Sequence, residues 1–323
     1  MDNYIQWWLK YKPLDNREQE LLSKKYEDYE IGQEDYSLQY LDLCPANNVA
    51  TTHSVSFDVS ATSIIDKLFS MYVDNKTLVI VSSDEHDSVK KHLEKSNTCV
   101  INRHNKNLDW GSIKKIVDGY TNIFCYIIGT TASGNITKDI FLKKIKSLCT
   151  NKKIIMVLDA VQEMFVLPRD YSMFDYIIGT AHAMTKEFDM GIVIRNNKLS
   201  DIGKKYKYRP LQHLELLKIV VQRMDKLFLL KPVLDMEFEK YSSILTPNNT
   251  IPSIVSYNSL YKFNITTFNL MKNYHIRIEG AEHTEEGVRI QPRFRASSFI
   301  KYPEALEKGI PLFKNIMESI CLR

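Results

Sequence analysis

The sequence has little that would suit a disulfide-rich, metal-binding or membrane-spanning protein. Among its 323 residues are only five cysteines, which are scattered and never stand at the C-x-x-C spacing of a metal or redox site. No run approaches the roughly eighteen apolar residues that a membrane-spanning helix needs, and no secretory signal is recognisable. We therefore expect reduced thiols, a cytoplasmic location and no membrane partner.

A strong charge of either sign is also missing. The formal net charge is +4, with 25% of the residues charged and 44% hydrophobic. The densest basic stretch, residues 204–209, is short and stands in no recognisable nucleic-acid-binding module. We expect no nucleic-acid partner. The length and composition favour a globular protein with one large domain and a smaller one.

Short apolar runs alternate with amphipathic segments from about residue 55 onward. The amphipathic segments 60–72, 110–117 and 139–148 have helical periodicity. Continuous apolar strands between helices indicate a mainly parallel sheet with helices on both faces, and therefore an α/β fold. Ligands bind such a sheet outside the carboxyl ends of its strands. The expected strands are residues 77–81, 123–128, 154–158, 176–178 and 191–194.

Changes in composition and in pattern along the sequence divide the chain into three parts. Residues 1–50 are polar and aromatic and are expected to form an N-terminal helical arm, and residues 51–240 the large α/β domain. Residues 241–323 should form a small α+β domain. In that domain we predict a helix over 252–271 and short strands near 275–278 and 287–290.

Polar residues follow several predicted strands or open the helices after them. Ser60, Ala61 and Thr62 begin a helix, and its free N–H groups with a hydroxyl could bind a phosphate, although ordinary capping has the same signature. The loop 129–135, which contains Thr131, is small and rich in hydroxyls. It would let a ligand approach the backbone, and an ordinary turn is the alternative.

Asp159 is the strongest single candidate for chemistry. A carboxylate at the end of a buried strand needs a partner, and a protonated pyridine nitrogen would supply one and let the ring accept electrons. A helix-capping or turn aspartate is the competing interpretation. Gln162 could reach a phenolic oxygen of the same ring. His86 could stack on it, or could be a surface turn residue.

Together these segments resemble the class V aminotransferase-like family of fold type I enzymes, which depend on pyridoxal phosphate (PLP). Residues 84–89 (Asp-Glu-His-Asp-Ser-Val) are similar to the ring-stacking histidine motif of cysteine desulfurases. Residues 159–162 are similar to the family's Asp-Ala-x-Gln motif, and residues 179–183 to its Ser-x-His-Lys motif. The resemblance implies that Thr180 and His182 contact the cofactor's phosphate.

Two segments near the C-terminus extend the resemblance. Residues 249–254 are similar to a segment of the alanine–glyoxylate aminotransferase branch, which implies that Thr250 contacts the phosphate of a neighbouring subunit's cofactor. Residues 287–292 are similar to the family's Val-Arg-Ile-Ser segment, which implies that Arg289 binds the substrate carboxylate. A guanidinium fork matches a carboxylate in two parallel hydrogen bonds. We therefore expect a homodimer with an amino-acid substrate.

The sequence departs from the family pattern in two places. No cysteine stands between Cys149 and Cys321, whereas a desulfurase needs a thiolate shortly before the arginine. Persulfide chemistry is therefore not expected. In addition, Ala183 occupies the position of the Schiff-base lysine. That lysine holds the cofactor covalently and moves a proton, and alanine can do neither.

Ala183 has three interpretations. We favour an engineered Lys→Ala change; a local shift in which Lys186 supplies the amine, or a natural protein without turnover, are the others. The chain's other matches to the family argue against decay of the site. The sequence thus predicts a PLP-dependent enzyme acting on an amino acid, with transamination as the first choice. A lyase, decarboxylase or epimerase, or a non-catalytic PLP-fold binding protein, is the alternative.

Overall fold

The computed structural model describes the greater part of the predicted large domain and five short strands beyond it. The residues described are 39–44, 52–103, 105, 107–131, 136–165, 167–180, 190–203, 214, 217–218 and the strands from residue 245 on. They fall into two compact units, which divide after Lys218. The domain boundaries at residues 50 and 240 remain predictions.

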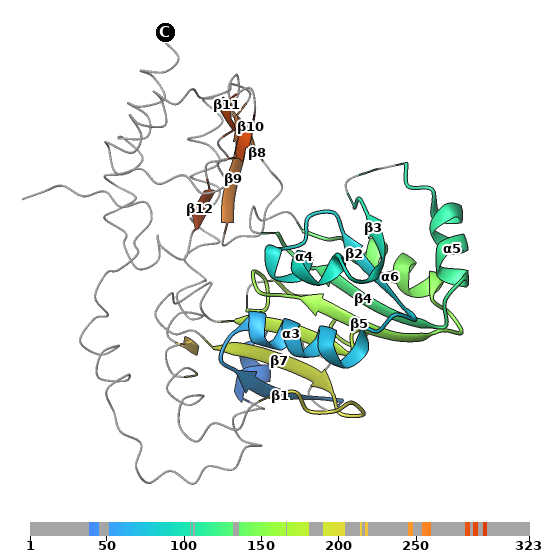
Figure 1. The fold of residues 1–323 in the computed structure, drawn as a ribbon. Helices are drawn as coiled ribbons and strands as arrows, with labels where there is room; N and C mark the ends of the chain where they lie inside the picture. Colours follow the sequence, from blue (N-terminus) through green and yellow to red (C-terminus); the bar gives the residue numbers. More distant parts are fainter. Residues whose placement is uncertain are drawn as a thin grey trace, which may run out of the picture. The chain divides into compact units, whose positions relative to one another are not determined.

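The first unit is built around one seven-stranded sheet, in the order β1-β7-β6-β5-β4-β2-β3 (Figure 1). Strand β7 is antiparallel to both of its neighbours, whereas all the other pairs are parallel. This confirms the mainly parallel sheet. The strands are β1 (His53–Asp58), β2 (Thr77–Ser82), β3 (Asn97–Ile101), β4 (Asn122–Ile128), β5 (Lys153–Asp159), β6 (Tyr176–Thr180) and β7 (Gly191–Asn196).

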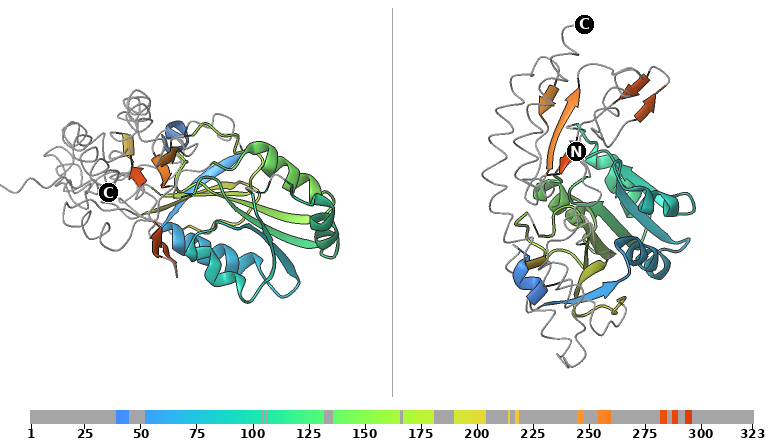
Figure 2. Two further views of the ribbon diagram at one scale, coloured as in Figure 1. Left: turned by 90° about the horizontal axis from the view of Figure 1, so that it is seen from above. Right: turned by 90° about the vertical axis from the view of Figure 1, so that its left-hand side faces the viewer.

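Helices cover both faces of this sheet. Helices α3 (Ala61–Tyr72) and α4 (Asp87–Leu93) lie on one face, and α5 (Trp110–Asp118) and α6 (Asp139–Leu148) lie on the other (Figure 2). The right-handed rule for parallel crossovers explains the division. The connection β2-α4-β3 moves toward one edge of the sheet, whereas β3-α5-β4 and β4-α6-β5 move back the other way.

The core forms where α3 packs on the sheet. Its apolar residues Ile64, Ile65, Leu68 and Phe69 recur at helical spacing and meet side chains of β2, β4, β5, β6 and β7. The alternate strand residues, such as Cys125, are equally buried from the opposite face, because successive side chains of a strand point to opposite sides. Within the described residues, no helix is long and apolar enough to cross a membrane.

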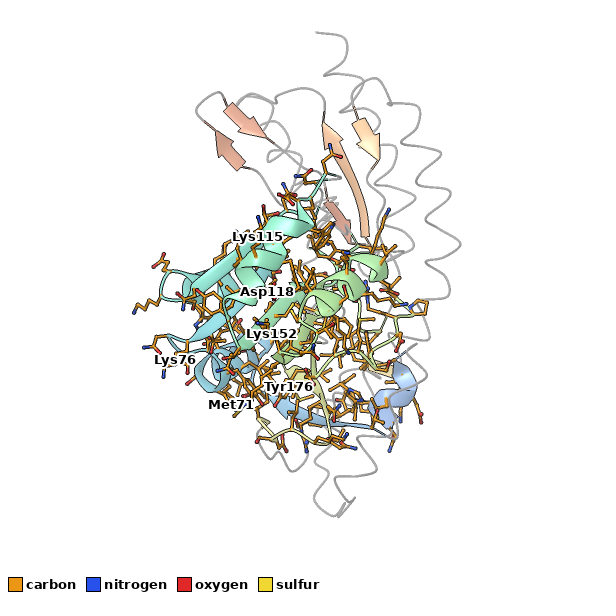
Figure 3. The ribbon with its side chains drawn as sticks, turned by 90° about the vertical axis from the view of Figure 1, so that its right-hand side faces the viewer. Met71, Lys76, Lys115, Asp118, Lys152 and Tyr176 are labelled. Atoms are coloured by element: carbon orange, nitrogen blue, oxygen red, sulfur yellow. The ribbon has the colours of Figure 1, made fainter. Side chains whose placement is uncertain are left out.

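The amino ends of the strands form a structural edge (Figure 3). Lys152, which precedes β5, donates to the carbonyl oxygens of Asp118 at 3.1 Å and Tyr120 at 2.7 Å. The hydroxyl groups of Tyr72 and Tyr176 lie 2.7 Å apart, where α3 ends and β6 begins. These contacts connect the ends of helices to the starts of strands. The polar loops lie at the opposite edge, at the carboxyl ends of the strands.

The second unit contains two small antiparallel sheets, β12-β9-β8 and β10-β11. Strand β9 corrects the predicted helix over 252–271, because Ile254, Val255 and Tyr257 are β-branched or aromatic and favour a strand. Strand β11 confirms the strand predicted near 287–290. The bounds are β8 (Leu245–Pro247), β9 (Ile254–Ser259), β10 (Glu282–Thr284), β11 (Gly287–Arg289) and β12 (Arg293–Arg295).

Gly191→Ala should destabilise the first unit. A Cβ atom at this position would lie 2.5 Å from the carbonyl oxygen of Ser60, which is backbone and cannot rotate away. We expect a loss of about 1–3 kcal/mol, measured by urea unfolding. Gly111→Ala is the control, since its nearest neighbour is an exposed Asp109 side-chain oxygen at 3.2 Å. Equal unfolding midpoints for the two variants would contradict the close approach.

Candidate functional site

The parallel register brings the predicted polar residues to one edge of the sheet. Asp159, the last residue of β5, is paired with Ile128 of β4 and Ile178 of β6. Thr180, the last residue of β6, is paired with Gly191 at the start of β7. Neighbouring strands lie about 5 Å apart, so residues at the ends of adjacent strands line one continuous edge.

Asp159 is a buried carboxylate at the middle of this edge. Its side chain accepts a hydrogen bond from the Tyr126 hydroxyl at 2.8 Å and another from the Val161 amide at 3.1 Å. Burial raises the pKa of Asp159, while these two bonds and the nearby His86 lower it. Among the described residues, no lysine or arginine pairs with Asp159. The carboxylate therefore suits a ligand that donates a cationic N–H.

Glu163 is also a buried carboxylate, but unlike Asp159 it is paired with an arginine. The Arg169 guanidinium donates to both carboxylate oxygens, with Nε–Oε1 at 2.6 Å and Nη2–Oε2 at 3.3 Å. The Thr130 hydroxyl donates to the same carboxylate, and Arg169 also donates to the carbonyl oxygen of Thr137 at 3.0 Å and to Asp139. This network fixes the loops after β4 and β5 against each other. This network was not predicted from the sequence.

A second buried arginine holds the neighbouring loops. Arg103 follows β3 and donates from Nε to Asp84 at 2.8 Å and from Nη1 to the Thr137 hydroxyl. That hydroxyl in turn donates to the carbonyl oxygen of Ile128 at 2.6 Å. The loops after β2, β3, β4 and β5 are therefore connected through the side chains of two arginines and one threonine.

Glu85 is a second buried carboxyl near Asp159. Its Oε1 atom accepts from the Ser82 amide at 3.1 Å, the Ser82 hydroxyl at 2.7 Å and the Ile128 amide at 3.0 Å. Its Oε2 atom is buried and has no hydrogen-bond partner among the described residues. Burial raises the pKa of Glu85 to about 8, against the lowering effect of the Ser82 and Ile128 bonds, and the charge of Asp159 raises it as well.

His86 lies at the start of α4, immediately after Glu85. Its Nδ1 atom accepts from the Ser88 amide at 3.2 Å, so the side chain caps the helix. The ring is exposed and close enough to Asp159 to lower the pKa of that carboxyl. This position is compatible with both interpretations of His86, as a helix cap and as a side chain that stacks on a ligand ring.

The predicted phosphate contacts lie on the other side of Asp159. Ser60 caps α3, with its hydroxyl oxygen accepting from the Ser63 amide at 3.1 Å. Ala61 and Thr62 form the first helical turn, whose N–H groups have no acceptor within the helix. The Ser60 carbonyl approaches Gly191 closely, and Gly191 is paired with Thr180. The structure therefore brings Ser60, Ala61 and Thr62 to the edge beside Thr180, whose own hydroxyl donates to the carbonyl oxygen of Met190 at 2.9 Å.

The structure describes the remaining predicted residues only in part. Thr131 is buried after β4, and Gln162 is half-buried in the turn after β5. Arg289 lies in β11, a strand described without its side chains. His182, Ala183 and Thr250 lie outside the described residues. The functional roles of all these residues remain predictions.

Comparisons with known proteins agree with the geometry. Residues 47–200 match the family model of aminotransferase class-V, which confirms the resemblance over the region that holds His86, Asp159 and Ala183. Pyridoxal phosphate is the cofactor that this match indicates. None of the curated proteins matches the chain.

Solved structures share the fold, and one of them is described as bound to PLP. A NifS-like protein from Rickettsia africae ESF-5 superimposes with a TM-score of 0.71 at 14% identity, covering 94% of this chain and 96% of its own. Ureidoglycine–glyoxylate aminotransferase from Bacillus subtilis gives 0.65 at 12% identity, covering 96% and 90%. A PLP-bound C–S lyase from Staphylococcus hominis gives 0.62 at 14% identity, covering 93% and 87%. These similarities confirm the fold type I architecture.

Arg169→Met should destabilise the protein strongly, because it leaves Glu163 buried beside Thr130 without a cation. Removal of one partner of such a pair typically costs about 3–5 kcal/mol. Urea unfolding at neutral pH would measure the loss.

The matched control for this prediction is the double variant Arg169→Met with Glu163→Gln. It removes the uncompensated charge, so it should recover part of the lost stability. If the double variant is no more stable than the single one, the ion pair does not account for the effect.

Proposed function

We propose that this chain binds pyridoxal phosphate at the carboxyl edge of its sheet and that its parent activity is transamination of an amino acid. The observation that carries the proposal is Asp159, a buried carboxylate with two neutral hydrogen-bond donors and no lysine or arginine partner among the described residues. A protonated pyridine nitrogen supplies the missing cationic donor. The class V match over residues 47–200 supports the same assignment.

The residues at the edge fit the parts of this cofactor. When bound, pyridoxal phosphate supplies a ring that accepts electrons from the substrate's Cα. Asp159 would hold the proton on the ring nitrogen, and Tyr126 and Val161 keep the carboxylate oriented for that contact. His86 would cover one face of the ring, and Gln162 would donate to its phenolic oxygen.

The phosphate would bind at the start of α3. Ser60, Ala61 and Thr62 present a helix N-terminus, which attracts an anion through its free N–H groups and its dipole. Thr180 lies at the same edge, and we assign Thr131 and His182 to the same binding surface. Two residues of the C-terminal part complete the proposal: Arg289 for the substrate carboxylate, and Thr250 for the cofactor of a second subunit in a cytoplasmic homodimer.

With alanine at position 183, the chain should still bind the cofactor but should not turn over substrate. With alanine at this position, the chain keeps the groups that hold the ring and phosphate but lacks an amine to hold the cofactor covalently and to move the substrate's proton. We therefore propose that the chain as it stands binds the cofactor without turning over. Lys186 as a substitute amine, or a natural binding protein, are the competing explanations.

A lyase, decarboxylase or epimerase is the second candidate. The fold does not choose among these reactions, because the orientation of the substrate in the pocket decides which bond at Cα is broken. A C–S lyase is among the solved structures with this fold. Desulfuration is disfavoured, since no cysteine lies between Cys149 and Cys321.

Ala183→Lys should turn the protein yellow when pyridoxal phosphate is added, because the new amine can form the covalent link that absorbs visible light. Borohydride reduction followed by peptide mass spectrometry should then locate the cofactor on residue 183. Ala183→Gln, which has a long polar side chain without an amine, is the control. A covalent label on Lys186 in the unsubstituted chain would instead establish the shifted-lysine explanation.

Asp159→Asn should weaken pyridoxal phosphate binding to the unsubstituted chain by about 10- to 100-fold, the size expected for the loss of a charge-assisted hydrogen bond. Equilibrium dialysis would measure the affinity.

The control for this substitution is Asp175→Asn. Asp175 is half-buried and accepts from the Met156 amide at 2.8 Å, but it precedes β6 at the opposite edge of the sheet. Equal affinities for the two variants would rule out Asp159 as the ring partner.

A further inference from the structure

We propose that Glu85 is a positioning residue for the ring site, which fastens the loop that carries His86 to the end of β4 beside Tyr126 and Asp159. The inference rests on the proposed function only in taking this edge as the ring site. The hydrogen bonds that carry it belong to the chain itself, so they can be tested without a cofactor.

Glu85 connects the ends of β2 and β4 through its carboxyl group, and we call this connection the clip. The backbone pairing of β2 and β4 ends at Val81 and Tyr126. Just beyond that point, Oε1 of Glu85 accepts from the amide and hydroxyl of Ser82, the last residue of β2, and from the amide of Ile128, the last residue of β4. One carboxyl oxygen thus continues the connection where the backbone ladder stops.

The clip lies directly before His86. Because Glu85 is buried and held by three donors, the chain leaves the sheet in a fixed direction, and His86 then begins α4 by accepting from the Ser88 amide. The same oxygen holds the end of β4, the strand that supplies the Tyr126 hydroxyl to Asp159. Glu85 therefore acts on the ring site through His86 and through Tyr126, without contacting a ligand.

The charge state of the clip follows from the groups that face it. Among the described residues, the titratable groups that interact electrostatically with Glu85 are Asp159, Tyr126 and Cys125, and none of them is a cation. A second carboxylate charge beside Asp159 would be buried without compensation. Burial, together with the charge of Asp159, raises the pKa of Glu85 to about 8, so Glu85 is neutral at neutral pH. The negative charge of this pair is then left to Asp159, where a ring N–H needs it.

The sign of the pH dependence follows. Glu85 keeps its proton below about pH 8 and loses it above. Below that pH the clip is neutral. Above it the ionised carboxyl keeps its three donors, but it repels the buried charge of Asp159 and is poorly solvated. The raised pKa also means that this group lowers the stability of the cofactor-free protein as pH rises from the ordinary glutamate pKa of 4.5 to about 8.

The first part of the experiment uses the cofactor-free protein and compares Glu85→Gln with Glu85→Ala. Glutamine keeps a neutral carbonyl oxygen for the three donors, whereas alanine removes it. By NMR, Glu85→Ala should speed hydrogen exchange of the Ser82 and Ile128 amides by about tenfold or more and shift the ring signals of His86. Glu85→Gln should leave both close to the parent. Asp87→Asn, an exposed substitution at the first residue of α4, is the control.

The second part measures pyridoxal phosphate affinity by dialysis between about pH 6 and about pH 9. At pH 7 we expect Glu85→Ala to bind about tenfold more weakly and Glu85→Gln to stay within about twofold of the parent. The parent should lose affinity relative to Glu85→Gln as pH rises through about 8. The ligand's own titration cancels in this comparison, because both proteins bind the same molecule.

The outcomes separate the two proposals. If the parent binds no pyridoxal phosphate at any pH, the proposed function fails, while amide exchange still tests the clip. If Glu85→Ala leaves amide exchange and affinity unchanged, or if Glu85→Gln behaves like Glu85→Ala, the neutral clip is wrong. A purely structural role would weaken binding in Glu85→Ala, but it would give no difference in pH profile between the parent and Glu85→Gln. That result would also overturn the proposal.

Discussion

The candidate site depends on the cost of burying a negative charge at the carboxyl edge of a parallel sheet. Asp159 is placed there by its register with Ile128 and Ile178, and burial raises its pKa. Its two neutral donors, Tyr126 and Val161, orient the carboxylate but supply no positive charge. A cationic ligand group therefore gains more at this position than at an exposed carboxylate, because the surroundings screen the interaction less.

The other buried charges at this edge are compensated within the protein, which makes the contrast informative. Arg169 compensates Glu163, and Arg103 pairs with Asp84, so the loops after four strands are held by buried and well-bonded arginines. Because these networks are satisfied, they fix the loops in one arrangement. Glu85 carries no uncompensated negative charge at neutral pH, because it keeps its proton. The edge as a whole therefore retains one carboxylate, Asp159, that is both buried and without a lysine or arginine partner among the described residues.

The sequence predicted the regular elements well where their pattern was strong. The five apolar runs became β2, β4, β5, β6 and β7, and the three amphipathic segments became α3, α5 and α6. Strands β1 and β3 were missed, because β1 alternates polar and apolar residues and β3 opens with the polar residues Asn97 and Thr98. The helix predicted over 252–271 was wrong at β9, where β-branched and aromatic residues and pairing with β8 and β12 favour a strand.

The supporting residues of the site could not be found from the sequence. Tyr126 stands 33 residues before Asp159, and Glu85 stands 43 residues before the Ile128 amide that it binds. Inside an apolar run Tyr126 has the signature of a core residue, and Glu85 has that of a polar loop residue. Only the parallel pairing of β2, β4 and β5 brings these groups together.

The sequence by itself determined the chemistry that is available: the order of the motifs, the lack of a cysteine between Cys149 and Cys321, and an alanine at position 183, where the resemblance to the family predicts a lysine. These are properties of residue type, and folding does not change them. The tertiary structure decided which carboxyl groups are buried and which of them find a cation. That distinction depends on distances across the sheet, and it separates Glu163, paired with Arg169, from Asp159, which has no such partner among the described residues.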